Sequence, residues 1–346
     1  MNNIIIKNAA QVVTCSGFRG KRGKEMSNLH VIENGTVIVT DGLISHILRK
    51  DEAIPVDEID FKVIDATGRA LLPGFVDPHT HFVFGGYREE EFSWRMRGDS
   101  YMDIMNRGGG IVNTTRATRE ASEEELIKAG RQRLNAMMQL GITTVEGKSG
   151  YGLDKDTEMK QLRVMEQLNR THPVDIVPTF MGAHATPAEW KGREDEFIDF
   201  NINEMFPLVA EKKLAECVDI FCEEGVFNIE QSRRYLSAAR EHGFKLKIHA
   251  DEIVNIGGAE LAAELNCLSA DHLLQVSDKG IKDMAESGVV ATILPLTAFS
   301  LREDYAPARE MIDEGCIVAL ATDLNPGSSF TASVPLLFAL ACIYMQ

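Results

Sequence analysis

The chain has 346 residues, 44% of them apolar, and a formal net charge of −16, so it is long enough for one (β/α)8 barrel of roughly 250 residues and a second, smaller unit. The acidic balance disfavours a nucleic-acid partner, because phosphate backbones are bound by clustered lysine and arginine. The six scattered cysteines favour reduced thiols over a disulfide frame, and no apolar segment reaches the roughly 20 residues of a membrane span, so we expect a cytoplasmic protein without a membrane partner.

Residues 1–65 carry short β-like segments separated by turn residues. The predicted strands are Asn3–Thr14, Thr36–Thr40, Leu43–Leu48 and Lys62–Ile64. Asn34-Gly35 and Asp41-Gly42 are typical of the turns that join antiparallel strands. We therefore interpret residues 1–65 as part of a small β-sandwich.

From residue 66 to the end of the chain, short apolar segments alternate with amphipathic, charge-rich ones. The eight predicted strands are Leu71–Phe75, Thr143–Glu146, Asp175–Phe180, Val218–Cys222, Lys245–His249, Leu268–His272, Val289–Leu294 and Ile317–Thr322. The clearest predicted helices between them are Glu123–Gln139, Asp156–Asn169, Glu230–Glu241 and Ala306–Glu314. The apolar segment from Val334 to Met345 is interpreted as one more helix on the barrel wall.

Eightfold alternation of strand and helix predicts the α/β class and a closed, parallel (β/α)8 TIM-type barrel. An open, doubly wound sheet is the alternative. It has less support, because no G-x-G-x-x-G sequence follows the first strand as a dinucleotide site requires.

Five of the nine histidines lie at the ends of predicted barrel strands, where the active sites of barrels form. They are His79, His81, His184, His249 and His272. His79 and His81 point to the same face, because side chains alternate along a strand. Asp323 adds a carboxylate at the end of strand eight. Imidazoles and one carboxylate around an open position are typical of a catalytic metal site.

These segments resemble the amidohydrolase superfamily of metal-dependent barrel hydrolases, on residues 73–81, His249, His272 and Asp323. Within it, the sequence is similar to the imidazolonepropionase family over nearly its whole length. The similarity is clearest in residues 84–92, 108–111, 146–152, 182–185, 249–252 and 323–327.

The resemblance implies hydrolysis of the cyclic amide of 4-imidazolone-5-propanoate to N-formimidoyl-L-glutamate, a step of histidine degradation. It also implies one divalent or trivalent metal ion, zinc or iron, bound by His79, His81, His249 and Asp323. Relatives with two metals commonly bridge them with a carboxylated lysine on strand four. Residues 218–223 contain no lysine, which favours a single ion.

Three residues are expected to act in catalysis. Asp323 can accept the proton of the attacking water, and His272 can donate a hydrogen bond to the carbonyl oxygen, where negative charge develops. Glu252 can carry a proton to the leaving ring nitrogen. The division of proton transfers among the three stays open, and a surface position is the alternative for Glu252.

The propanoate group of the substrate requires a cation, and Arg88 is the best candidate because guanidinium pairs bidentately with carboxylate. A local ion pair with the neighbouring glutamates is the alternative. Tyr101 is a further candidate for the pocket. The resemblance extends the substrate contacts to Tyr151, His184, Glu252, Asn325, Gly327 and Ser328.

The chain ends at Gln346, within the helix expected after strand eight. Family members continue further and add strands to the sandwich, so we expect an incomplete sandwich and a barrel truncated after strand eight, with exposed apolar surface. Two functional alternatives stay open: another hydrolase or deaminase of the superfamily, and a non-catalytic truncated barrel. A homodimer is compatible with the sequence.

Overall fold

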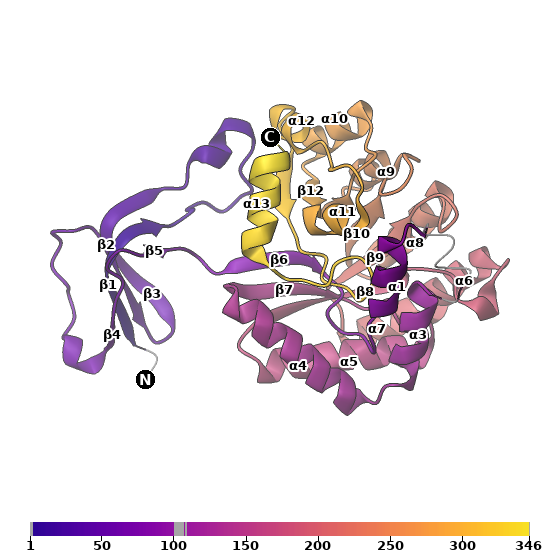
Figure 1. The fold of residues 1–346 in the computed structure, drawn as a ribbon, viewed down its shortest axis with the longest axis horizontal. Helices are drawn as coiled ribbons and strands as arrows, with labels where there is room; N and C mark the ends of the chain where they lie inside the picture. Colours follow the sequence, from indigo (N-terminus) through magenta and orange to yellow (C-terminus); the bar gives the residue numbers. More distant parts are fainter. Residues whose placement is uncertain (1–2, 100–106, 108, 346) are drawn as a thin grey trace. The chain divides into compact units, whose positions relative to one another are not determined.

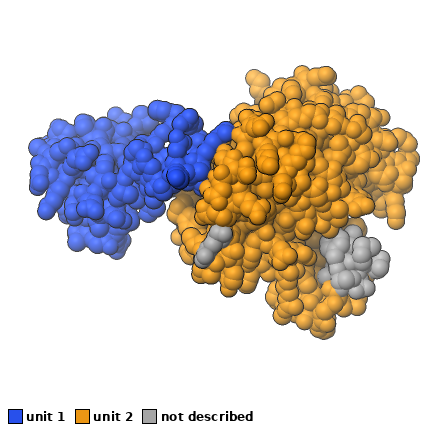
Figure 2. Space-filling model, turned by 90° about the horizontal axis from the view of Figure 1, so that it is seen from above, with its two compact units in different colours: residues 1–74 blue, residues 75–346 orange. Residues whose placement is uncertain are grey.

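The computed structural model describes residues 3–99, 107 and 109–345 (Figure 1). The chain divides into two compact units, residues 1–74 and residues 75–346, which Figure 2 colours separately. In the part of the chain that the structure describes, no helix combines the length and the apolar character needed to cross a bilayer.

The first unit is a five-stranded sheet with strand order β3-β2-β1-β4, in which β5 also pairs with β1. The strands are β1 (Ile4–Val13), β2 (Val31–Thr40), β3 (Leu43–Leu48), β4 (Lys62–Asp65) and β5 (Ala70–Leu71), with short 3-10 turns at Gly23–Ser27 and Glu58–Asp60. A small core of Ala9, Val12, Val37 and Ala66 stabilises the sheet.

Two details of this unit differ from the prediction. Asn34-Gly35 is not a turn but lies inside β2, next to the irregularity in the β1–β2 register between Ile6 and Ala9, and Asn34 has a φ of 51°. A Cβ atom on Gly35 would lie 2.8 Å from a methyl group of Val12, so the packing of Val12 against β2 favours glycine at this position. In addition, β4 runs parallel to β1, where an antiparallel strand was expected, and the unpredicted strand β5 is also parallel to β1.

The boundary between the units lies after Gly74 instead of after residue 65, because Ala70–Leu71 pairs with β1 of the first unit. The predicted first barrel strand, Leu71–Phe75, is therefore wrong. The barrel begins with β6 (Phe75–Thr80), and the register of β6 against β7 shifts between Asp77 and Thr80, around Pro78, which has no N–H to donate.

The second unit confirms the predicted (β/α)8 barrel. Its eight strands form one sheet, ordered β6 to β13 along the chain, and all neighbouring pairs are parallel. After β6 come β7 (Ile142–Lys148), β8 (Asp175–Ala183), β9 (Cys217–Cys222), β10 (Lys245–Ala250), β11 (Ser269–His272), β12 (Val290–Ile293) and β13 (Ile317–Leu320). The other seven predicted strands are thus confirmed, with ends that differ by a few residues.

Hydrogen bonds beyond the end of β13 close the barrel against β6. The Asp323 N–H donates to the His79 carbonyl at 3.0 Å, and the His81 N–H donates to the Leu324 carbonyl at 2.9 Å. The buried Asp77 carboxylate accepts from the Thr322 N–H and hydroxyl at 3.0 and 2.5 Å. This closure brings the H-x-H segment next to the strand-eight acid.

Helices surround the sheet (Figure 1). The described ones are α1 (Glu89–Met96), α3 (Ile111–Glu120), α4 (Glu123–Gln139), α5 (Lys155–Thr171), α6 (Glu194–Phe200), α7 (Phe206–Lys212), α8 (Ile229–Glu241), α9 (Gly258–Glu264), α10 (Asp278–Ser287), α11 (Pro295–Leu301), α12 (Ala308–Asp313) and α13 (Val334–Tyr344), with a 3-10 turn at Ala188–Trp190 and a π-helical segment at Asn201–Met205.

The predicted helix Glu123–Gln139 is confirmed as α4. Ser122 stabilises its N-terminus with a capping box. The apolar segment that contains α13 is also helical, and Phe338 of α13 packs edge-on against Phe75 of β6 at 5.4 Å.

Candidate functional site

The four residues predicted to bind a metal lie together at the carboxyl ends of the barrel strands. His79 belongs to β6, His81 follows it directly, and His249 belongs to β10. All four side chains are almost fully buried. The Asp323 Oδ1 atom lies 3.5 Å from His79 Nε2 and 3.8 Å from His81 Nε2, and the ring centroids of His79 and His249 are 4.5 Å apart.

Three overlapping sets of side chains could hold a metal ion, with donor atoms within 4.8 Å of one another. They are His79 with His81 and Asp323, His79 with His249 and His272, and His81 with His184 and His249. All six predicted histidine and aspartate residues of the site thus converge on one small region.

The donor atoms have the character that a metal requires. His79 Nε2 and His81 Nδ1 are buried and make no hydrogen bond within the described residues. Burial holds the pKa of His79, His81 and His249 well below the ordinary value, and nearby cationic and imidazole groups lower it further, so the rings are neutral. Neutral imidazoles with free lone pairs beside a carboxylate fit a divalent cation.

Buried aspartates fix which nitrogen of two rings faces the site. His79 Nδ1 lies 2.7 Å from Asp271, and His249 Nδ1 lies 3.1 Å from Asp219. An ionised carboxylate can only accept, so Nδ1 carries the proton in both rings and the Nε2 lone pair is free. Thr297 donates to the other oxygen of Asp323 at 2.7 Å and orients this carboxylate in the same way.

His272 and Glu252 lie on one side of the cluster, with His272 Nδ1 3.3 Å from Glu252 Oε1. The His272 ring centroid is 5.0 Å from that of His249. Glu252 is largely buried, which does not fit the alternative of a surface carboxylate. Burial raises the pKa of Glu252 to about 8, and the charges of Asp323 and Glu223 add to the shift. This suits a carboxyl that exchanges a proton near neutral pH.

Left-handed backbone at the strand ends places several of these side chains. The φ angles are 48° at Asp251, 78° at His272 and 50° at Asp323. Asp271 is in register with His249, so both side chains share one face of the sheet. In a regular strand the His272 side chain would point to the opposite face of the sheet from Asp271. The left-handed φ of His272 turns its side chain, which also reaches the cluster. Such sparsely populated backbone is typical of functional sites.

Arg88 and Tyr151 form a second group next to the histidines. Burial raises the pKa of the Tyr151 hydroxyl and the nearby Arg88 guanidinium opposes this shift, while the Arg88 Nε atom is buried and makes no hydrogen bond within the described residues. The ring centroids of Tyr151 and His81 are 5.5 Å apart, and His184 stacks on His81 at 4.9 Å. The local ion pair of Arg88 with Glu91 is long, at 3.9 Å.

The predicted residues Asn325, Gly327 and Ser328 form a tight turn under Arg88. Asn325 Oδ1 accepts from the backbone N–H groups of Gly327 and Ser328, both at 2.8 Å. A Cβ atom on Gly327 would lie 1.9 Å from the Arg88 guanidinium, so only glycine leaves room for this arginine. Tyr101 lies outside the described residues.

Comparison with known proteins identifies the family. The sequence model of the amidohydrolase family matches residues 62–119 and 98–337. The chain belongs to the amidohydrolase family. It is 62% identical over 345 residues to a protein of Clostridium tetani named imidazolonepropionase, in a match that covers 99% of this chain and 82% of the relative. A protein of Parabacteroides distasonis with the same name is 60% identical over 346 residues, with coverages of 100% and 83%.

Solved structures support the fold of this amidohydrolase. A triazine hydrolase from Arthrobacter aurescens matches with a TM-score of 0.72 at 15% identity, covering 99% of this chain and 76% of that one. A guanine deaminase from C. acetobutylicum matches with a TM-score of 0.66 at 14% identity, covering 98% and 78%. At these identities the likeness concerns the fold alone.

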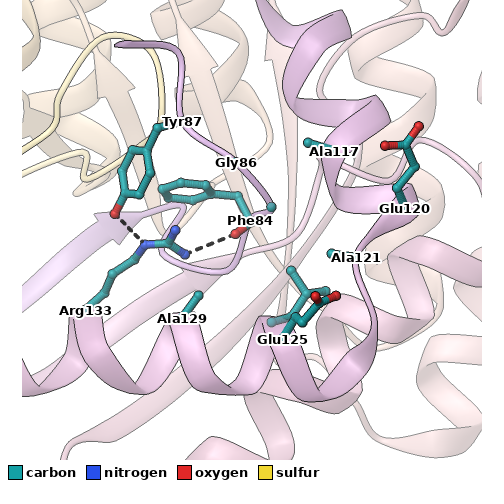
Figure 3. A pocket seen from close by; sticks show the side chains of 11 residues that line it. Phe84, Gly86, Tyr87, Ala117, Glu120, Ala121, Glu125, Ala129 and Arg133 are labelled. Atoms are coloured by element: carbon teal, nitrogen blue, oxygen red, sulfur yellow. Dashed lines mark hydrogen bonds between the residues drawn. The ribbon is translucent and has the colours of Figure 1, made fainter.

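The loop after β6 that carries Arg88 is anchored to α4 of the amidohydrolase by Arg133 (Figure 3). This guanidinium donates to the carbonyls of Phe82 and Phe84 at 2.8 and 3.1 Å and to the Tyr87 hydroxyl at 3.0 Å. It also lies 3.4 Å from the centroid of the Phe84 ring. A pocket of about 490 Å³ adjoins this anchor, and no histidine of the cluster lines it.

Several buried residues that the sequence interpretation missed hold the histidine and aspartate side chains of the cluster, directly or through one another. They are Glu146, Lys148, Asp219, Lys247, Asp271 and Thr297, all of them buried. A signal for some of them exists in the sequence: Glu146 and Lys148, like Lys247 and His249, are charged or polar residues two positions apart within a predicted barrel strand or at its end. Period-two polarity inside a barrel strand indicates side chains that point into the barrel.

Proposed function

We propose that this chain hydrolyses the cyclic amide of 4-imidazolone-5-propanoate to N-formimidoyl-L-glutamate, a small-molecule reaction of histidine degradation. The two relatives named imidazolonepropionase, at 62% and 60% identity, support this substrate. The site supports it independently, since a candidate metal centre lies beside a partly buried arginine whose Nε atom is buried and without a hydrogen bond among the described residues.

One zinc or iron ion would be held by His79, His81, His249 and Asp323, whose donor atoms converge and whose two tethered rings turn Nε2 inward. When bound, such an ion lowers the pKa of water from 15.7 to about 7 and polarises a carbonyl. Zinc is named for an adenosine deaminase from Xanthomonas campestris with the same fold, which makes zinc the first ion to test.

Substrate orientation would fall to the group around Arg88. The free Nε of Arg88 and the nitrogens beside it offer the planar fork that binds a carboxylate, and so would hold the propanoate. Tyr151 and the stacked rings of His81 and His184 offer flat surfaces for the planar imidazolone ring. Asn325, Gly327 and Ser328 keep Arg88 in place, and Tyr101 stays a prediction for the same pocket.

Proton transfer would involve three side chains. Asp323, oriented by Thr297, would accept the proton of the attacking water. His272 would donate a hydrogen bond to the carbonyl oxygen of the substrate, where charge builds up. Glu252, 3.3 Å from His272, would deliver a proton to the ring nitrogen as the amide bond breaks.

The convergence of His79, His81 and Asp323 next to Arg88, with the unpaired His79 Nε2 atom 3.5 Å from Asp323 Oδ1, is the observation that carries this proposal. The test is the loss of imidazolone propanoate absorbance with purified protein of measured metal content. We expect turnover with this compound and none with ring amines such as adenine or guanine. Release of ammonia from a ring amine, without opening of the imidazolone, would favour a deaminase instead.

A further inference from the structure

Lys148, the last residue of β7, has no part in the proposed reaction although it lies at the centre of the site. Its side chain is fully buried. Its ammonium group contacts three carboxylates: Asp219 at 2.5 Å, Glu146 at 2.7 Å and Asp271 at 3.6 Å. These attractions outweigh burial and raise the pKa of Lys148, so the group is a permanent cation.

Two of these carboxylates are the ones that hold the imidazoles. Asp219 bonds Lys148 through Oδ2 and accepts from His249 Nδ1 through Oδ1, at 3.1 Å. Asp271 uses Oδ2 both for His79 Nδ1, at 2.7 Å, and for Lys148. One ammonium group therefore connects, through one aspartate each, to histidines on two different strands.

The two connections are not equivalent. Asp271 has a second cation, because Lys247 Nζ lies 3.4 Å from its Oδ2 and also donates to the Pro78 carbonyl at 2.8 Å. Among the described residues, Lys148 is the only lysine or arginine within ion-pair distance of Asp219. Removal of Lys148 should therefore disturb His249 far more than His79.

We propose that Lys148 is a positioning residue that fixes the orientation and tautomer of His249 through Asp219, and secondarily those of His79 through Asp271. The ammonium group holds the Oδ2 atom of Asp219 and leaves Oδ1 facing His249, so that the ring bonds through Nδ1 and keeps Nε2 for a metal. The importance of this for catalysis rests on the proposed function, but the tautomer itself does not.

The direct test is nitrogen NMR of the full-length protein labelled with ¹⁵N at histidine, without metal and with zinc. In the parent protein we expect His249 and His79 as the Nδ1–H tautomer before zinc is added. In Lys148→Met we expect His249 to lose this preference and His79 to keep it. Zinc affinity, measured by competition with a chelator, should fall about 10- to 100-fold.

Two control variants separate this role from general stability. Lys247→Met removes a buried lysine that contacts Asp271 but not Asp219, and it should leave the His249 tautomer unchanged. Lys160→Met removes a partly buried lysine that donates to the backbone of residues 118–121, and it should change neither tautomer nor zinc affinity. If Lys148→Met does not fold, Lys148→Met with Glu146→Gln also removes one of the carboxylates left unpaired.

A folded Lys148→Met protein with an unchanged His249 tautomer and unchanged zinc affinity would overturn the inference. A lower melting temperature alone would likewise assign Lys148 a merely structural role. If the parent protein binds zinc and shows the expected tautomers but does not open imidazolone propanoate, the proposed function fails and the positioning role stands.

Discussion

The two halves of the site are built in different ways. The histidine half rests on barrel strands and on a buried network of carboxylates and lysines, whereas the Arg88 half rests on loops held by backbone hydrogen bonds and by Arg133. A buried charge network tolerates little change, because the loss of one charged side chain leaves the charge of its partner buried and unpaired. A loop anchor can loosen gradually. We therefore expect changes in the first half to abolish function and changes in the second to weaken substrate binding.

The largest effect should come from a metal ligand. His249→Ala removes one of the converging nitrogens, and we expect turnover to fall by about 10⁴-fold or more because activated water is lost. Activity and bound metal are measured together on the same preparation. His242→Ala, at the end of α8 away from the cluster, is the control, and an equal loss in both variants would contradict the assignment.

Glu252→Gln should come next. The amide keeps the size of the side chain but cannot deliver a proton, so kcat should fall by about 10²- to 10³-fold with metal content unchanged. Stopped-flow and steady-state absorbance measure the effect. A full kcat for the amide variant would remove Glu252 from the reaction and shift its role to His272 or Asp323.

Arg88→Gln tests the other half. Loss of a charge-assisted pair with the propanoate should lower kcat/KM by about 10- to 100-fold, mainly through KM. The matched experiment uses an imidazolone that lacks the carboxylate, for which the variant and the parent protein should perform equally. A similar loss with both compounds would mean that Arg88 supports the fold of the loop instead of binding substrate.

Arg133→Lys should give the smallest effect. Lysine keeps the charge but has all its donors on one atom and lacks the planar fork that spans from the two carbonyls to the Tyr87 hydroxyl, so we expect a KM a few-fold higher and a free energy of unfolding lower by about 1–3 kcal/mol. Arg131→Lys, on the exposed side of the same helix, is the control. An unchanged KM would show that the loop holds Arg88 without this anchor.

The sequence predicted the half of the site that follows strand periodicity. His79, in β6, and His81, directly after it, point to the same face of the sheet. The eight-strand pattern brings His249 and Asp323 to the same end of the barrel. The alternation of side chains along a strand and the succession of strands and helices along the chain can both be read from the sequence without coordinates.

What it missed depends on long-range closure and on unusual backbone. Asp219 and Asp271 contact histidines 30 and 192 residues away, and one sequence contains no signal for that pairing. The left-handed φ of His272 is equally invisible, because histidine is not a residue that demands it. The late start of β6 arises because Ala70–Leu71 pairs with β1, a competition that local patterns do not resolve.

The most direct test of the central claim is a metal titration. Protein stripped of metal is mixed with increasing zinc or ferrous iron, and the hydrolysis of imidazolone propanoate is followed at each step. We predict activity that rises linearly and stops at one equivalent, with His79→Ala, His81→Ala and Asp323→Asn each unable to regain it. Full activity in the stripped protein, or a requirement for two equivalents, would contradict a single ion held by these four side chains.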